Sequence, residues 1–248
     1  MKNYLYKLIV VLLLTLNLFG CDKSQTKQTN NSALLIFMEY ENNVEPYQTR
    51  LIVTPDFLRF DDGEGANDFV LFDRNKKKIF SINTEEQTVM SISEKQHDIK
   101  PPFELKLEDK RLPLGDDAPE IAGKEAKHFR FLANGEACYE VIAVEGLMPE
   151  VVTALKEFNR ILASDSAMTF NTLPADMHNA CEMSMDTFAV GRHLDKGFPI
   201  QEWSESGAGR HLVDYKEDYQ PVAKLFEMPK DFQYYSVQDY REGKVSFE

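Results

Sequence analysis

Cysteine and histidine are the side chains here that could ligate a metal or act as nucleophile and base. The chain has three cysteines and five histidines in 248 residues. His178 and Cys181 lie one helical turn apart, but no two histidines have the H-x-x-x-H spacing of metal ligands. Zinc needs four convergent ligands, and a disulfide at Cys181 would remove one of this pair. The sequence therefore predicts no metal site, no cofactor and no catalytic residue.

Two polar clusters could also suggest chemistry. Ser204–Gly209 places serines among glycines, but it lacks the G-x-S-x-G elbow of hydrolases and no helical pattern follows it. We interpret it as a flexible turn. The acidic residues of Asp61–Asp68 crowd one turn in an order that differs from a calcium-binding loop. We expect a solvated hairpin tip there.

The third cysteine, Cys21, ends an N-terminal segment with the layout of a secretory signal. A positive start at Lys2 and Lys7 precedes a mostly apolar run over residues 8–19. Residues 18–21, Leu-Phe-Gly-Cys, resemble the lipobox of bacterial lipoproteins, in which a peptidase cuts before a cysteine that is then lipid-modified. Phe19 is bulkier than the usual residue at that position.

An uncleaved N-terminal anchor, with Cys21 uninvolved, is the alternative. The apolar run is shorter than the roughly 20 residues of a spanning helix and is interrupted by Thr15 and Asn17.

The lipobox resemblance implies a cellular location. It makes residues 1–20 a signal peptide, and Cys21 a lipidated first residue that holds the chain stably on a membrane, since two or more acyl chains suffice for that. The expected location is the periplasmic side of a bacterial envelope, and Asp22 favours the inner membrane. The polar tract up to Ser32 would be a flexible tether, followed by one domain over residues 33–248.

Cys138 and Cys181 then remain as an even pair. In an oxidising periplasm such a pair indicates a disulfide. Two buried free thiols are the alternative, because unpaired cysteine is often buried.

Composition limits the classes of partner. The net charge is −13, and removing residues 1–20 would leave 228 residues with a charge near −15. Such a charge disfavours nucleic acid and anionic headgroups, which are polyanions. The mean hydropathy of −0.40 excludes a polytopic membrane protein, and 43% hydrophobic residues can supply a core.

Short apolar runs at regular spacing predict an antiparallel meander over residues 33–144. Two hairpin turns are expected at 61–65 and at Asn134-Gly135. Helical spacing of apolar residues predicts a helix over 148–162 and a second over 174–190. Strands return at 198–203, 210–215 and 222–226. The methionines of the helical part (Met148, Met177, Met183 and Met185) could line an irregular apolar ligand or simply pack the helices on the sheet.

Turn and core residues of Arg50–Ile92 and of Lys196–Pro229 resemble bacterial periplasmic proteins with a LolA/LolB-like fold, in a branch without assigned function. The resemblance covers most of residues 33–232. It implies an α+β fold: a strongly curved antiparallel sheet, or half-open barrel, with two helices packed on its concave face. The helical insert near residues 148–190 departs from the family pattern.

The expected function follows from that fold. It is non-enzymatic binding of an apolar ligand or a lipidated client in the concavity of the sheet. The alternative is a structural or accessory envelope protein that acts through surface contacts with another protein.

Overall fold

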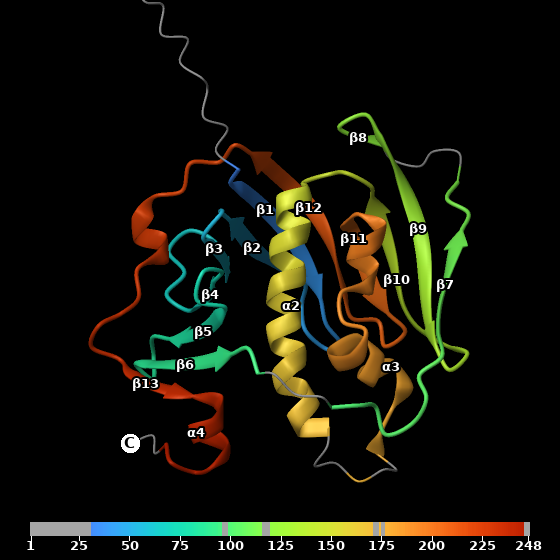
Figure 1. The fold of residues 1–248 in the computed structure, drawn as a ribbon. Coiled ribbons are helices and arrows are strands. Elements are labelled where there is room, and N and C mark those ends of the chain that lie inside the picture. Colours follow the sequence, from blue (N-terminus) through green and yellow to red (C-terminus); the bar gives the residue numbers. More distant parts are fainter. Residues whose placement is uncertain (1–30, 96–98, 116–119, 171–173, 175–176, 246–248) are drawn as a thin grey trace, which may run out of the picture.

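The computed structural model describes residues 31–95, 99–115, 120–170, 174 and 177–245, so the predicted signal peptide and Cys21 lie outside the described residues. The strands are β1 (Ala33–Tyr40), β2 (Tyr47–Val53), β3 (Phe57–Asp61), β4 (Phe69–Asp73), β5 (Lys78–Asn83), β6 (Thr88–Ser93), β7 (Leu107–Leu112), β8 (Glu120–Ile121), β9 (Lys124–Ala133), β10 (Glu136–Val144), β11 (Phe198–Ser204), β12 (Gly209–Glu217) and β13 (Gln233–Ser236). The helices are α2 (Pro149–Phe170), α3 (Ala180–Met183), η2 (Ser184–Phe188), η3 (Arg192–Lys196), η4 (Ala223–Phe226) and α4 (Val237–Arg241). Figure 1 shows their arrangement.

The thirteen strands form one open sheet in the order β13-β6-β5-β4-β3-β2-β1-β12-β11-β10-β9-β7, with β8 paired to β9 off this path. Neighbouring strands are antiparallel except β13, which runs parallel to β6. The two ends of the order, β13 and β7, do not pair with each other, so the sheet is not closed.

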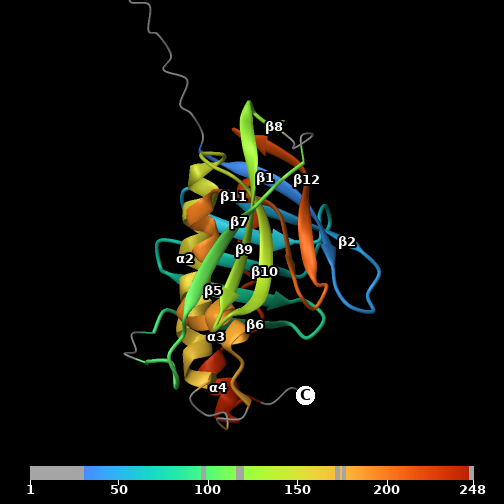
Figure 2. The same ribbon diagram turned by 90° about the vertical axis from the view of Figure 1, so that its right-hand side faces the viewer.

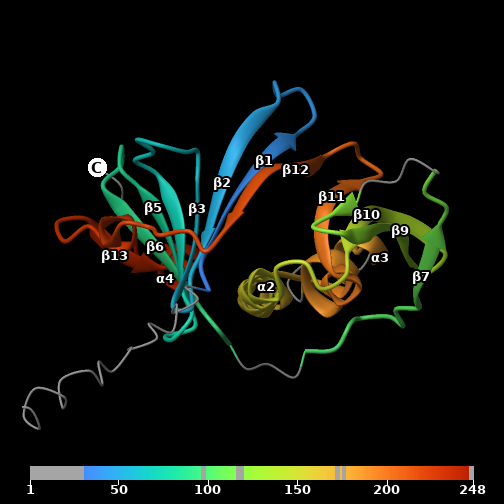
Figure 3. The same ribbon diagram turned by 90° about the horizontal axis from the view of Figure 1, so that it is seen from above.

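The expected fold class, a half-open barrel with two helices on its concave face, is therefore wrong. One long helix, α2, lies between the two halves of the open sheet (Figure 3). Where a second long helix was predicted, over 174–190, α3 has four residues and passes into the π-helical turn η2. Asn179 caps α3 by accepting the backbone N–H groups of Cys181 and Glu182, and the Cys138–Cys181 disulfide anchors this segment to β10.

The strands predicted over residues 33–92 and the hairpin at Asn134-Gly135 are confirmed. Asn134 and Gly135 both have positive φ, 52° and 86°, as the right-handed twist of a two-residue hairpin requires. The strand predicted at 222–226 is instead the 3-10 helix η4. Strand β13 was not predicted.

α2 builds the main core on the face of the sheet that we call the inner face. Its Val151, Ala154 and Ile161 are almost completely buried. Phe158 adds ring contacts to Phe60 and Phe72, with centroids 5.4 and 6.0 Å apart. Burying such a stripe is the usual source of helix stability in proteins.

The C-terminal segment covers the opposite, outer face of β3–β6. Leu71, Ile82 and Val89 are buried there beneath Phe226 and other apolar side chains of residues 226–232. The Phe226 ring stacks on Phe57 at 5.1 Å. Both faces of this half of the sheet are thus removed from water, which explains why its strands are apolar on both sides.

A buried ion cluster ties this covering segment to the sheet. Asp61 accepts two hydrogen bonds from Arg50, at 2.7 and 2.9 Å, and one from Arg59 at 2.5 Å. Arg59 also donates to the carbonyl of Leu225 and lies 3.7 Å from the Phe69 ring centroid. The expectation of a solvated acidic tip is therefore wrong for Asp61, whose side chain is 1% exposed, although Asp62 is exposed.

The cysteine pair forms the predicted disulfide. Cys138 on β10 and Cys181 on α3 have Cα atoms 5.1 Å apart and are 43 residues apart in the sequence. Among the described residues, no helix is both long enough and apolar enough to cross a membrane.

Replacing Asp61 with Asn should destabilise the fold by about 3–5 kcal/mol, because it leaves two buried guanidinium groups without their carboxylate. Burial opposes ionisation of Asp61, but hydrogen bonds from Arg50 and Arg59 outweigh it and hold its pKa below the usual range. The carboxylate therefore stabilises the fold above about pH 4, and this contribution is lost as the pH falls through the lowered pKa. Denaturant unfolding at several pH values measures both effects.

The matched control is Asp62→Asn, which should change stability by less than about 0.5 kcal/mol because the side chain is exposed. Equal stability of the two variants at neutral pH would contradict a structural role for the ion cluster.

Replacing Cys138 and Cys181 together with Ala should lower the free energy of unfolding by about 2–4 kcal/mol, since closing a loop of this length restricts the unfolded chain. Denaturant unfolding gives the size of the effect, and mass analysis without reductant shows whether the thiols are bonded. Free thiols in the native protein would refute the pairing.

Candidate functional site

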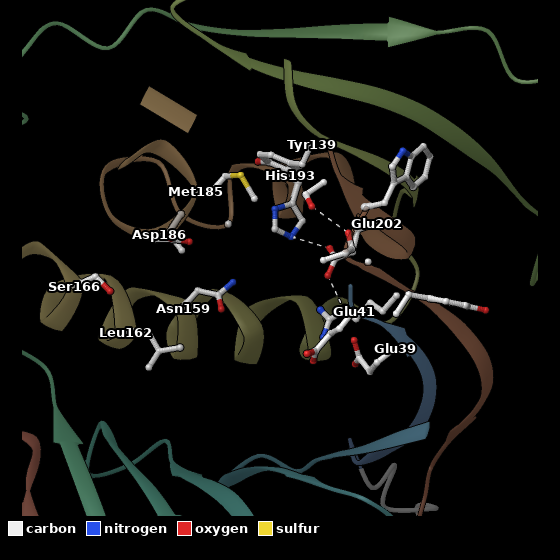
Figure 4. Close-up of a pocket in the computed structure, with 18 of the residues that line it drawn as sticks. Glu39, Glu41, Tyr139, Asn159, Leu162, Ser166, Met185, Asp186, His193 and Glu202 are labelled. Atoms are coloured by element: carbon white, nitrogen blue, oxygen red, sulfur yellow. Dashed lines mark hydrogen bonds and ion pairs between the residues drawn. The ribbon is translucent and has the colours of Figure 1, made fainter. Parts of the chain in front are cut away.

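A cleft of about 1060 Å³ lies between α2 and the sheet (Figure 4). One wall comes from α2 and the η2 region, and the other from β1, β10, β11 and β12. Its lining includes Glu39, Tyr40, Glu41, Asn42, Tyr139, Asn159, Leu162, Asp165, Ser166, Phe170, Met185, Asp186, Val190, Gly191, His193, Glu202, Trp203, Ser204, Ala208, Gly209, Arg210 and Arg241.

The sheet wall carries an ion pair fixed by strand register. Glu202 on β11 lies directly opposite Arg210 on β12, and Arg210 Nε lies 2.6 Å from Glu202 Oε1. The Arg210 guanidinium also lies 4.8 Å from the ring centroid of buried Phe37, so its charge is shared between a carboxylate and an aromatic face. Burial would raise the pKa of Glu202, but Arg210 and His193 outweigh it and hold the pKa below its usual range.

His193 meets the other carboxylate oxygen of Glu202. Its Nε2 lies 3.5 Å from Glu202 Oε2 (Figure 4), and its ring packs edge-on against Tyr139 with centroids 5.7 Å apart. Burial lowers the pKa of His193 despite the nearby carboxylate, so the imidazole is neutral at pH 7.

Gly197 allows the tight turn between η3, which carries His193, and β11. It has φ 125°, and a Cβ there would lie 2.4 Å from the Val144 carbonyl oxygen. A side chain would therefore push the end of η3 away from β10.

Tyr139 forms the floor beside His193. It is 7% exposed and stacks on Phe131 at 4.7 Å, and burial raises its pKa to about 12. Arg192 lies over both rings and donates to the Leu132 carbonyl at 2.9 Å. The phenol is thus a neutral hydroxyl at physiological pH.

Asp165 closes one end of the cleft. Arg241 of α4 donates to both of its oxygens, at 2.9 and 2.7 Å, and Lys95 Nζ lies 3.2 Å from Oδ1. This bidentate geometry is the strong form of an ion pair. The two ion pairs of Asp165 join α2, the segment that follows β6, and the C-terminal helix α4 at one point.

Among the described residues, three further carboxylates line the cleft without a cationic partner: Glu39 and Glu41 on the sheet side and Asp186 in η2. Glu39 accepts from the Thr49 hydroxyl at 2.8 Å, and Glu41 accepts from the Tyr47 hydroxyl. In the part of the chain that the structure describes, none of the three has a Lys, Arg or His nitrogen within 4.0 Å. Both arginines of the cleft are already paired, so its field is negative.

The sequence-predicted candidates reach the cleft only in part. The disulfide lies in the segment that forms the cleft wall, and Met185 lines the cavity. Met148 and Met183 are buried in the core, whereas Met177 is 60% exposed. Cys181 is bonded to sulfur, which removes it as a partner for a metal at His178. Cys21 lies outside the described residues.

Sequence reasoning missed His193, Glu202 and Arg210. Period two along β11 and β12 could have placed the last two on one face, but the strand register was unknown. His193 is in a short loop helix whose position depends on tertiary packing.

Comparison with known proteins adds little. No protein-family model and no curated protein matches the chain. An uncharacterized conserved protein from Thermus thermophilus has a similar structure, with 14% identity, TM-score 0.39, and coverage of 83% of this chain and 90% of that one. Two crystal structures of PNGF-II match with 11% identity and TM-scores of 0.40 and 0.39 over 85% of this chain, which spans 32% of PNGF-II. At these TM-scores the likenesses carry no functional argument.

NMR titration of the full set of histidines should place the pKa of His193 below about 6.5, because burial disfavours the cation. Glu202→Gln should lower it further by removing a favourable negative charge. Arg210→Gln should move it upward by removing a repelling positive charge. Shifts in the same direction for both variants would contradict the described electrostatics.

Proposed function

We propose that the chain is a lipid-anchored module of the bacterial envelope that holds an amphipathic ligand in the cleft and performs no catalysis. One observation carries this proposal: a cleft of about 1060 Å³ in which apolar side chains gather on the α2 and η2 side, while carboxylates lie on both walls, with Glu39, Glu41 and Glu202 on the sheet side and Asp165 and Asp186 on the helical side. Small-molecule sites are usually concave, mostly apolar and supplied with a few placed polar groups.

The helical wall suits an acyl or other apolar chain. Leu162 and Phe170 of α2 and Met185 and Val190 of the η2 region all line the cavity, and all four are only partly buried. Removing such apolar surface from water stabilises the bound state by roughly 25 cal/mol per Å². Methionine adds adaptability to an irregular ligand.

The sheet wall suits a headgroup that donates hydrogen bonds or carries positive charge. Glu39 and Glu41 have no cationic partner within ion-pair distance in the described part of the chain. Arg210 and Arg241 are held by Glu202 and Asp165, so they offer little to an anion. An anionic headgroup would be repelled by the unpaired carboxylates of Glu39 and Glu41.

The geometry around His193 supports binding rather than catalysis. At 3.5 Å, its contact with Glu202 is longer than an ordering hydrogen bond. No hydrogen bond joins a serine, threonine or cysteine of the described residues to His193, and the neighbouring Cys181 is in a disulfide. A triad would need a nucleophile in contact with the histidine.

Anchoring by Cys21 and the LolA/LolB-like resemblance remain predictions. Cys21→Ser should abolish acyl labelling and release the chain from membranes, whereas unchanged attachment would defeat the lipobox interpretation. The second candidate function, an accessory envelope protein acting through surface contacts, is favoured by the exposed edge strand β7.

The single tryptophan, Trp203, lines the cleft, so its fluorescence should report occupancy. With residues 21–248 carrying Cys21→Ser, dodecyltrimethylammonium below its micelle concentration should give a saturable change. Dodecyl sulfate should bind about tenfold more weakly or less, because it brings negative charge to the carboxylates.

Val190→Asp should weaken binding of the cationic probe by about tenfold, because it places a charge among the apolar side chains of the cleft. Val213→Asp is the matched control, since Val213 is 48% exposed on β12 and does not line the cleft. No saturable signal with either probe, or equal effects of the two aspartates, would overturn the cleft as the binding site.

A further inference from the structure

β7 (Leu107–Leu112) is a free edge of the sheet. It pairs with β9 on one side, and no described strand pairs with its other side. Figure 2 shows β7 at the outside of the molecule. Its first five residues are all exposed. An edge of this kind presents unpaired N–H and C=O groups that can pair with another strand.

The register identifies which backbone groups face outward. Asn134 donates its N–H to the Lys106 carbonyl at 2.9 Å, and the β7–β9 ladder continues from that pair without a shift. Hydrogen-bonded and non-bonded pairs alternate in an antiparallel ladder. Residues 108, 110 and 112 therefore bond to β9, whereas 107, 109 and 111 turn their backbone groups to the open side.

The side chains of β7 carry opposite charges two residues apart. Glu108 and Lys110 share one face of the strand, with their side chains 54% and 56% exposed and 3.8 Å apart. Asp109 and Arg111 share the other face, where Asp109 is held by Lys196 at 2.6 Å. Charged side chains on a short edge strand protect it from indiscriminate pairing, whereas opposite charges two residues apart allow a partner strand in one register to pair unlike charges.

We propose that this edge is the interface of a homodimer, in which β7 strands of two copies pair antiparallel about a two-fold axis at Asp109. Glu108 of each copy then lies opposite Lys110 of the other, twice by symmetry. About six backbone hydrogen bonds form from the outward groups of residues 107, 109 and 111. The single like-charge pair, Asp109 with Asp109, is neutralised on each side by Lys196.

Other registers fit less well. Residues that face each other must lie on the same face and have matching backbone directions, so the register can shift only by two. One such shift places Lys110 opposite Lys110 and brings in Pro113, which has no N–H to donate. The opposite shift places Glu108 against Glu108. Only the register centred on Asp109 pairs unlike charges on the Glu108–Lys110 face throughout.

The contact between two strands of this length is small, so the dimer is weak in dilute solution, where stable interfaces bury more than about 1,000 Å². Tethering both copies to one membrane raises their effective concentration. The dimer rests on one part of the proposed function, the lipid anchor. It does not depend on ligand binding in the cleft.

The test uses two differently tagged full-length copies made in the same cells, chemically crosslinked in their membranes before solubilisation and then captured through one tag. Wild-type copies should capture each other. Glu108→Lys in both copies should reduce capture by about tenfold, because two attractive pairs become repulsive. Lys110→Glu in both copies should do the same. Glu104→Lys, the same charge change at an exposed residue outside β7, should have no effect.

Charge restoration separates pairing from misfolding. One copy with Glu108→Lys and one with Lys110→Glu should capture each other at the wild-type level, and so should two copies carrying both changes. Absence of wild-type capture, or single variants that bind like the wild type, would overturn the proposal. Failure of the mixed pair to recover would also overturn it.

Discussion

The packing of α2 on the inner face of the sheet is the contact on which the rest of the structure depends. The same helix supplies Val151, Ala154 and Ile161 to the core and Leu162 and Asp165 to the cleft. The two halves of the sheet are joined by the β1–β12 pairing, while the ends of the strand order do not meet, and α2 lies between the halves (Figure 3). The cleft exists where α2 and the sheet wall diverge, beside the disulfide-anchored segment that ends in η2.

Buried charge is organised by the same rule throughout this acidic chain. Asp61 is held by two arginines, Asp165 by Arg241, and Glu202 by Arg210. The Arg50–Asp61, Arg241–Asp165 and Arg210–Glu202 pairs each join two different elements, whereas Arg59 and Asp61 both lie on β3. Removing one partner of such a pair costs more than the pair itself contributes. Because these pairs use the nearby arginines, Glu39, Glu41 and Asp186 remain to set the sign of the field in the cleft.

The strands of residues 33–92 and the hairpin at Asn134-Gly135 could be predicted because period two and turn residues are local properties. The length of the second helix could not, since apolar spacing over 174–190 does not reveal that Asn179 caps a short helix and that a disulfide fixes it to β10. Residues 222–226 resemble a strand in sequence, but they form the 3-10 helix η4, in which Val222 is 66% exposed and Phe226 packs on the outer face. Burial of Asp61 required knowing that Arg50 lies opposite it. The cleft depends on contacts between elements distant in sequence, which no local pattern records.

The proposed lipid anchor, ligand cleft and pairing edge together describe a module whose role lies in what it binds. Mass spectrometry of solvent extracts from the full chain, purified from its native membranes, tests this most directly. The proposed function predicts one amphiphile in about stoichiometric amount, absent from a chain carrying Val190→Asp. Extracts that contain only the lipids of the surrounding membrane, in the same amounts for both chains, would contradict it.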